Sequence, residues 1–221
     1  MLLPIRTNIL PKRTPYANYA LIVVNVLIFL ATYWPHVIPE TGEREIIRLW
    51  AQPFELMPNR PQLWQFISYA FLHGGYMHIL GNMYFLYLFG NNVNDKLGHI
   101  SYICFYLAGA VFSGVGHVAF SSGVGVPTLG ASGAVAAVTG AYLVLFPQTL
   151  ITVLYWFFFI GTLDLPALYF IAIKMIFIDN VIVRYTPHVA YDAHLAGYAF
   201  GIVASLIVLA TGLVQTSAFD L

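Results

Sequence analysis

The chain has 221 residues, of which 60% are hydrophobic and only 8% are charged, and its formal net charge is zero. Soluble domains are on average about 25% charged, so these proportions exclude a soluble enzyme, a disordered tail and a disulfide-rich secreted domain. A net charge of zero also offers no electrostatic attraction for nucleic acid. The composition therefore indicates an integral membrane protein.

Six apolar runs approach or reach the length of a transmembrane helix, which is about 17–25 residues. We expect spans over residues 16–34, 75–90, 100–120, 132–146, 166–183 and 193–213. Arg6, Lys12 and Arg13 precede the first run, which is too long for the apolar core of a signal peptide. Basic residues beside a first span favour a cytoplasmic N-terminus. We therefore expect a multi-pass protein of the cell membrane with an uncleaved first span.

Two connecting segments differ from the spans. Residues 35–65 combine arginines, glutamates and prolines, and we expect a long, partly structured external loop there, with an interfacial helix over residues 43–50. Residues 150–163 are apolar but short, and their run of aromatic side chains is typical of the membrane–water interface. We do not count this second segment as a span.

The fourth helix is short for a membrane span. It follows the Gly- and Ser-rich residues 121–130 and ends before Pro147. About 15 residues rise only ~22 Å, whereas the hydrocarbon core is ~30 Å thick. One end of this helix should therefore lie below the membrane surface, where a non-helical loop needs protein or a water-filled cavity around it.

These expectations define one all-α membrane domain of six transmembrane helices, with a long external loop between the first two. The domain occupies residues 16–213, between a short cytoplasmic segment at 1–15 and a short tail at 214–221.

Four polar side chains lie where an apolar bundle has no structural need for them: His78, Asn82, Ser132 and His194. Polar groups in hydrocarbon are costly unless paired, so each is a functional hypothesis. Ser132, in Gly130-Ala131-Ser132-Gly133, stands at a loop-to-helix junction where backbone N–H groups lack partners and a developing negative charge is stabilised. The alternative is that Ser132 is an ordinary N-cap.

His194 opens the last helix and shares one helix face with Gly197 and Gly201. Small residues allow close helix packing in membranes, and the alternative role of His194 is a structural hydrogen bond. With six spans, the second, fourth and sixth helices all begin on the same side of the membrane. His78, Ser132 and His194 lie near those three starts, so we expect them to share a side and a depth.

His78 and Asn82 are one helical turn apart on the second helix. Both side chains are able to donate a hydrogen bond to a developing oxyanion. The alternative is that the two side chains only hold helices together.

Together these motifs resemble the rhomboid family of intramembrane serine proteases. The resemblance runs from about Pro61 to Gly201 and includes Phe71-Leu72-His73-Gly74-Gly75 before His78. It implies a six-helix bundle that cleaves transmembrane protein substrates with a Ser–His dyad, without metal or cofactor. By that similarity Ser132 is the nucleophile and His194 the general base. His78, Asn82 and the Ser132 N–H would form the oxyanion hole.

The sequence departs from the family pattern at three positions. Trp64-Gln65 stands where Trp-Arg is usual, Asn94 stands where a glutamate is common, and Ala136 replaces a frequent aromatic residue. The first two concern loop structure. The third concerns the orientation of His194.

Three other functions remain to be compared. A proteolytically inactive rhomboid-like protein that binds transmembrane clients would typically lack one member of the dyad, and both are present here. A metalloenzyme would use His73, His78 and His194 as zinc ligands, but no His-Glu-x-x-His motif accompanies them. A transporter would be indicated by inverted repeats, and the sequence shows none.

Overall fold

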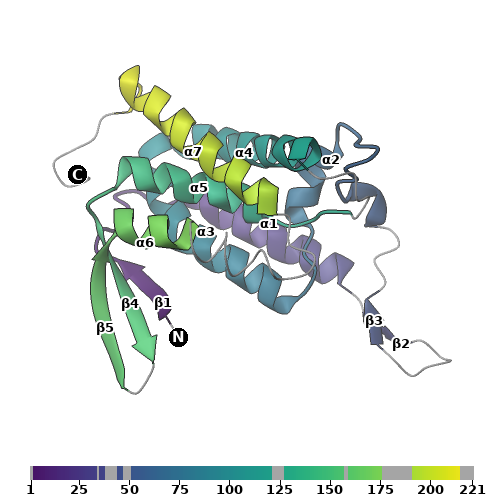
Figure 1. Cartoon of the computed structure of the whole chain (residues 1–221), viewed down its shortest axis with the longest axis horizontal. Coiled ribbons are helices and arrows are strands. Elements are labelled where there is room, and N and C mark those ends of the chain that lie inside the picture. The colour runs from purple at the N-terminus through teal and green to yellow at the C-terminus, as the bar shows by residue number, and fades with distance from the viewer. Residues whose placement is uncertain are drawn as a thin grey trace.

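The computed structural model describes residues 2–33, 35–37, 44–46, 51–120, 127–156, 159–175 and 191–214. Long helices form a bundle that makes up most of this part of the chain (Figure 1). They are α1 (Tyr16–Thr32), α3 (Tyr76–Leu97), α4 (His99–Phe120), α5 (Ser132–Leu145) and α7 (Tyr191–Ala210), with the shorter α6 (Ala167–Ile173) beside them.

Helix α5 is the centre of the bundle. Nearly all of its residues are buried, and it packs against α3, α4 and α7. A helix that is apolar all round is typical of such a surrounded position. Its alanines and glycines let the neighbouring backbones approach closely, which is how membrane helices associate without a hydrophobic driving force.

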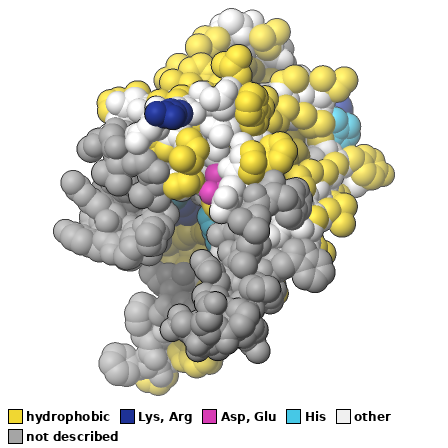
Figure 2. All heavy atoms as spheres, turned by 90° about the vertical axis from the view of Figure 1, so that its right-hand side faces the viewer, with side chains coloured by type: hydrophobic (Ala, Val, Ile, Leu, Met, Phe, Trp, Pro, Cys, Tyr) yellow, Lys and Arg dark blue, Asp and Glu magenta, His cyan; other side chains and the backbone are white. Residues whose placement is uncertain are grey.

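The outer surface of the bundle is apolar. Helices α4 and α7 are long and apolar enough to cross a membrane, and α1 and α5 are shorter apolar helices. Val23, Leu27 and Leu30 of α1 are each more than half exposed. Figure 2 shows hydrophobic side chains over much of the described surface on the side that carries α2 (Gln65–Ser68). A surface with so many exposed apolar side chains suits a lipid environment.

The predicted spans correspond to helices with some changes in their bounds. The second span continues to Leu97, seven residues beyond its predicted end. The fifth begins as α6 and reaches Met175, and the rest of its predicted range lies outside the described residues. Lys174, at the end of α6, donates a hydrogen bond of 2.9 Å to the Tyr198 hydroxyl of α7.

The chain is mostly helical, as predicted, but it is not all-α, because a small antiparallel sheet accompanies the helices. Its strands β1 (Leu2–Thr7), β4 (Leu150–Trp156) and β5 (Ile160–Pro166) have the spatial order β1-β4-β5. Strands β4 and β5 pair in antiparallel fashion, so the described residues of 150–163 are strands, and our expectation that they are not a span is confirmed. Five of the seven residues of β4 are β-branched or aromatic, which favours a strand, and a short apolar run has no period that distinguishes strand from helix.

The predicted interfacial helix at 43–50 is also wrong where the structure describes it. Residues Arg44–Ile46 form strand β3, which pairs with β2 (Pro35–Val37), and residues 47–50 lie outside the described part. Strand pairing satisfies the backbone hydrogen bonds that a short isolated helix leaves open. Among the described residues between β3 and α3 are the 3₁₀ turns η1 (Gln52–Phe54) and η2 (Tyr69–Phe71), on either side of α2.

Candidate active site

Ser132 is the first residue of α5 and does not cap it. The N-cap position belongs to Ala131, no side chain there bonds a backbone N–H, and the first helical bond runs from Val135 N–H to Ala131 C=O at 2.9 Å. The N-cap interpretation of Ser132 is therefore wrong. The backbone N–H groups of Ser132 and the next two residues have no acceptor within the helix. The side chain of Ser132 is partly exposed, so it is accessible at the positive end of α5.

The loop before Ser132 is held in place by backbone hydrogen bonds. Leu56 and Thr128 exchange two bonds of 2.9 Å, and Gly130 N–H donates to Tyr69 C=O at 2.9 Å. Gly130 has φ +133°, a conformation that favours glycine. Tyr69 in turn donates its hydroxyl to Ala110 C=O of α4 at 2.8 Å. The position of Ser132 is thus fixed by contacts to both η2 and α4.

His78, in the first turn of α3, lies beside this loop. A Cβ atom on Gly130 would lie 2.7 Å from His78 Nε2 and 3.7 Å from Ser132 Oγ. Only glycine at position 130 therefore lets the imidazole approach the serine. The backbone N–H of Gly74 donates to His78 Nδ1 at 3.3 Å. In the neutral ring this places the proton on Nε2, the nitrogen that faces Gly130 and Ser132.

His73 packs against His78 from the preceding loop. The two ring centroids are 5.2 Å apart and the rings are nearly perpendicular. Burial, and to a smaller extent the electrostatic influence of His78, lower the pKa of His73 to about 3, while a hydrogen bond with the Phe71 backbone opposes the shift. His73 is therefore neutral at physiological pH and supports the His78 ring without adding a charge.

Asn82 lies one turn after His78 on α3. Its side chain is only 7% exposed, and its Nδ2 atom has no hydrogen-bond partner among the residues that the structure describes. An unpaired donor in a buried place is destabilising, so it needs an explanation. A ligand oxygen that binds during function would supply the missing acceptor.

His194 lies in the first turn of α7, and α7 contacts α5 closely. A Cβ atom on Gly197 would lie 2.2 Å from Gly133 C=O, and one on Gly201 would lie 2.0 Å from Ala137 C=O. These contacts follow both helices in the same direction, so α5 and α7 begin at the same end of the bundle. Ser132 and His194 thus lie on adjacent turns of neighbouring helices. His78, in the first turn of α3, lies beside the loop that leads to Ser132.

One residue near this site was not singled out from the sequence. Ser113 of α4 is fully buried beside Gly133 and Gly197, and its Oγ has no hydrogen-bond partner in the described part of the chain. Gly109, Ser113 and Gly116 lie on one face of α4, and a Cβ on Gly116 would lie 2.3 Å from Ala196 Cβ of α7. This spacing of small residues was the available signal for a packing face.

The structure also gives local roles to the departures from the family pattern. Gln65 Oε1 accepts the backbone N–H of Gln62 at 3.0 Å, and its Nε2 donates to Pro53 C=O at 3.1 Å, so Gln65 holds the loop that contains η1. Ala136 is buried within α5. No group of three metal-binding side chains occurs among the described residues.

The described residues form a bundle of apolar helices with an apolar outer surface, which is the arrangement of a polytopic membrane protein. Comparison with known families matches residues 60–211 to the Rhomboid domain. The chain therefore belongs to the rhomboid family and is an integral membrane protein.

Curated relatives are similar over a shorter stretch. Rhomboid protease GlpG of Yersinia pestis is 33% identical over 100 residues, which are 45% of this chain and 34% of the relative. Rhomboid-like protein 11, chloroplastic, of Arabidopsis thaliana is 31% identical over 111 residues, which are 50% of this chain and 34% of the relative. The matched stretch thus spans about a third of the length of these relatives.

Proposed function

We propose that the protein is an intramembrane serine endopeptidase that hydrolyses peptide bonds in or near the transmembrane segments of membrane proteins. The observation that carries this proposal is the convergence at Ser132. An uncapped helix start, the protonated Nε2 of His78 and the Asn82 amide, which has no partner among the described residues, are hydrogen-bond donors at the same end of the bundle. Several donors gathered at one end match the needs of a transient oxyanion.

In the proposed reaction Ser132 Oγ attacks the substrate carbonyl carbon while His194 accepts the hydroxyl proton. The carbonyl oxygen gains the negative charge and binds the Ser132 N–H, His78 Nε2–H and Asn82 Nδ2–H groups. Collapse of this intermediate expels the amine, which takes the proton from His194 and leaves an acyl-enzyme. Water, deprotonated by His194, then releases the acid and restores Ser132.

The substrate must be extended at the cleaved bond, because a helical peptide bond is shielded by its own turn. Glycine, alanine or serine near that bond fits best: glycine and serine weaken the helix, and small side chains enter most easily. Ser132 is partly exposed at the end of α5, so an unwound segment is able to reach it without opening the bundle.

The test compares the wild-type protein with Ser132→Ala and His194→Ala in detergent, with a model transmembrane substrate. Each substitution should abolish cleavage, and the double variant should be no less active than either single one, because the two residues act as one unit. A fluorophosphonate probe should label the wild type and not Ser132→Ala. The matched control is Ser205→Ala, since Ser205 is a buried serine of α7 far from the helix start.

Cleavage by a folded Ser132→Ala protein would contradict the nucleophile assignment. A wild-type protein that binds the substrate but neither cleaves it nor reacts with the probe would instead favour the inactive, client-binding alternative. Loss of cleavage in the presence of chelators would favour a metalloenzyme.

A further inference from the structure

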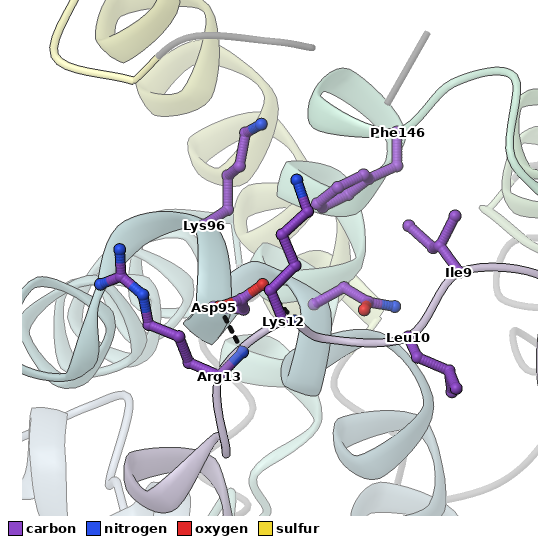
Figure 3. Close-up of a pocket in the computed structure, with 8 residues that line it drawn as sticks. Ile9, Leu10, Lys12, Arg13, Asp95, Lys96 and Phe146 are labelled. Atoms are coloured by element: carbon purple, nitrogen blue, oxygen red, sulfur yellow. Dashed lines mark hydrogen bonds between the residues drawn. The ribbon is translucent and has the colours of Figure 1, made fainter. Parts of the chain in front are cut away.

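A second polar site lies at the opposite end of α3 from His78. It is a pocket of about 390 Å³ between the segment that precedes α1, the last turns of α3 and the residue after α5 (Figure 3). Helix α3 has 22 residues, which rise about 33 Å, so this pocket and the candidate active site lie near opposite faces of the membrane. Pockets of about 300–1,000 Å³ are typical of small-ligand sites.

The pocket is rich in positive charge. Lys12, Arg13 and Lys96 line it, and Asp95 is the acidic residue among its lining side chains. The C-terminal end of α3 adds about half a negative charge. The net charge of the lining side chains together with this helix end is still positive. Figure 3 shows the three basic side chains extending from the rim around the pocket. Their chemistry is suited to an anion such as a phosphate group.

The carboxylate of Asp95 already accepts hydrogen bonds from the backbone. Its two carboxylate oxygens accept the N–H groups of Lys12 at 2.8 Å and Arg13 at 3.1 Å. These bonds hold the main chain of the segment against α3, while the Lys12 and Arg13 side chains extend away from it. A fixed backbone lowers the entropy that is lost when two long side chains bind a ligand. The carboxylate thus positions the backbone that carries the Lys12 and Arg13 side chains.

The pocket also has an apolar side. Ile9 packs against the core, Phe146 is buried, and Leu10 is 84% exposed at the rim. Tyr16, the first residue of α1, is 67% exposed close by in sequence, as is typical of aromatic residues at the membrane surface. A free phosphate would make no use of the exposed Leu10, whereas a phospholipid presents its phosphate and its acyl chains side by side.

We propose that this pocket binds the headgroup of an anionic phospholipid from the leaflet at the N-terminal side of the bundle. The phosphate contacts Lys12, Arg13 and Lys96, and the first carbons of the acyl chains contact Leu10. This is the side on which the sequence predicts the cytoplasm, where anionic lipids attract basic residues near the membrane surface. The lipid would link the N-terminal segment to α3.

The experiment uses the whole protein in nanodiscs of phosphatidylcholine with and without phosphatidylglycerol. Native mass spectrometry measures the retained phosphatidylglycerol, and a thermal melt measures stability in each lipid. The wild type should retain phosphatidylglycerol and melt at a higher temperature when it is present. Arg13→Gln and Lys96→Gln should each weaken retention about fivefold, which corresponds to one basic side chain near an anionic surface.

Arg60→Gln is the matched control, because Arg60 is an exposed arginine that is not part of the pocket. It removes the same charge and should leave retention unchanged. The Asp95 bonds involve the main chain, so Arg13→Gln keeps them and should melt like the wild type in phosphatidylcholine alone. If either pocket variant fails to fold, the wild-type comparison of the two lipids at low and high salt still tests the site.

Three results would overturn the proposal. Equal retention by wild type, Arg13→Gln and Arg60→Gln would show that the pocket is not the lipid site. Equal retention of phosphatidylcholine and phosphatidylglycerol by the wild type at low salt would exclude a charge-selective site. Full stabilisation by glycerol 3-phosphate in phosphatidylcholine nanodiscs would show that a soluble phosphate compound is the ligand.

Discussion

At the scale of single residues, the donor role proposed for His78 depends on where its ring proton lies. Gly74 N–H donates to Nδ1, so the neutral ring carries its proton on Nε2, next to Gly130 and Ser132. The sequence placed His78 and Asn82 on one face of a helix but gave no information on the tautomer. The tautomer follows from the backbone N–H of Gly74 in the preceding loop. The pattern of side chains in the sequence does not predict that contact.

Loss of an oxyanion donor should slow cleavage without abolishing it. His78→Ala and Asn82→Ala should each lower kcat by up to about 10²–10³-fold, the effect of one donor in soluble serine proteases. Asn82→Ala should also leave stability unchanged or slightly higher, because its Nδ2 group is buried without a partner among the described residues. Kinetics and thermal melts measured together separate this outcome from a structural role. Wild-type kcat in both variants would leave the two residues as helix contacts.

The low pKa of His73 makes stability depend on pH. The folded value of about 3 lies below the ordinary 6.5, so between these values the unfolded chain binds a proton that the folded protein does not. The contribution of His73 is complete above pH 6.5 and decreases as the pH falls towards 3, by about 1.4 kcal/mol per pH unit. In detergent micelles, His73→Gln should therefore show a shallower loss of unfolding free energy from pH 7 to pH 5. Equal slopes would show that folding does not lower the pKa of His73.

At the scale of secondary-structure elements, the lengths of the apolar runs in the sequence predict where the helices lie. The polar residues that follow the second run place the end of α3 too early. The second span is predicted to end at residue 90, just before the polar Asn91, Asn92 and Asn94. Instead α3 continues through them, and all three side chains are buried. Their partners lie on α1, in β1 and at the start of α4, and no local pattern identifies those on α1 and β1. Strand β4 was missed because a seven-residue apolar run has too few residues to show its period.

The contact between α5 and α7 should determine whether His194 reaches Ser132. A side chain at Gly197 or Gly201 would meet the backbone of α5 at distances below 3 Å, so the helices would have to separate. A displacement near 1 Å lowers rates about 10²-fold when reacting groups must stay aligned. Gly197→Val and Gly201→Val should therefore reduce cleavage at least that much while the protein remains in the membrane.

Gly81→Val is the control for the valine substitution, because nothing lies within 4 Å of a Cβ at Gly81 in α3. It should retain cleavage. Activity assays and membrane fractionation of the three variants measure the effect. Full activity in both α7 variants would show that this helix contact does not position His194.

At the scale of the whole molecule, a buried polar network joins α1 to α3 and α4. Asn18 of α1 donates its amide to Asn91 Oδ1 at 2.8 Å and to Leu86 C=O at 3.0 Å, and it accepts the Tyr102 hydroxyl at 2.6 Å. Asn94 accepts the backbone N–H of Asn18 at 3.2 Å. Asn94 thus occupies the place of the common family glutamate as part of this network. In a bundle with few charges, such a network specifies how α1 docks.

Replacement of Asn18 should therefore destabilise the entire bundle. Asn18→Ala leaves Asn91 Oδ1, Leu86 C=O and the Tyr102 hydroxyl without these partners in a buried place, and each unsatisfied group costs about 1–3 kcal/mol. Relaxation and water entry reduce the sum, so we expect a loss of about 3 kcal/mol in unfolding free energy. Asn59→Ala, at an exposed asparagine of the loop before α2, should change the unfolding free energy by less than about 0.5 kcal/mol.

Gly90→Ala should destabilise the bundle like Asn18→Ala, since its Cβ would lie 2.4 Å from the Tyr102 hydroxyl oxygen and 2.6 Å from Asn18 Oδ1. Denaturation in mixed micelles measures all three variants. If Asn18→Ala unfolds at the same denaturant concentration as Asn59→Ala, the docking of α1 depends on apolar packing and not on this network.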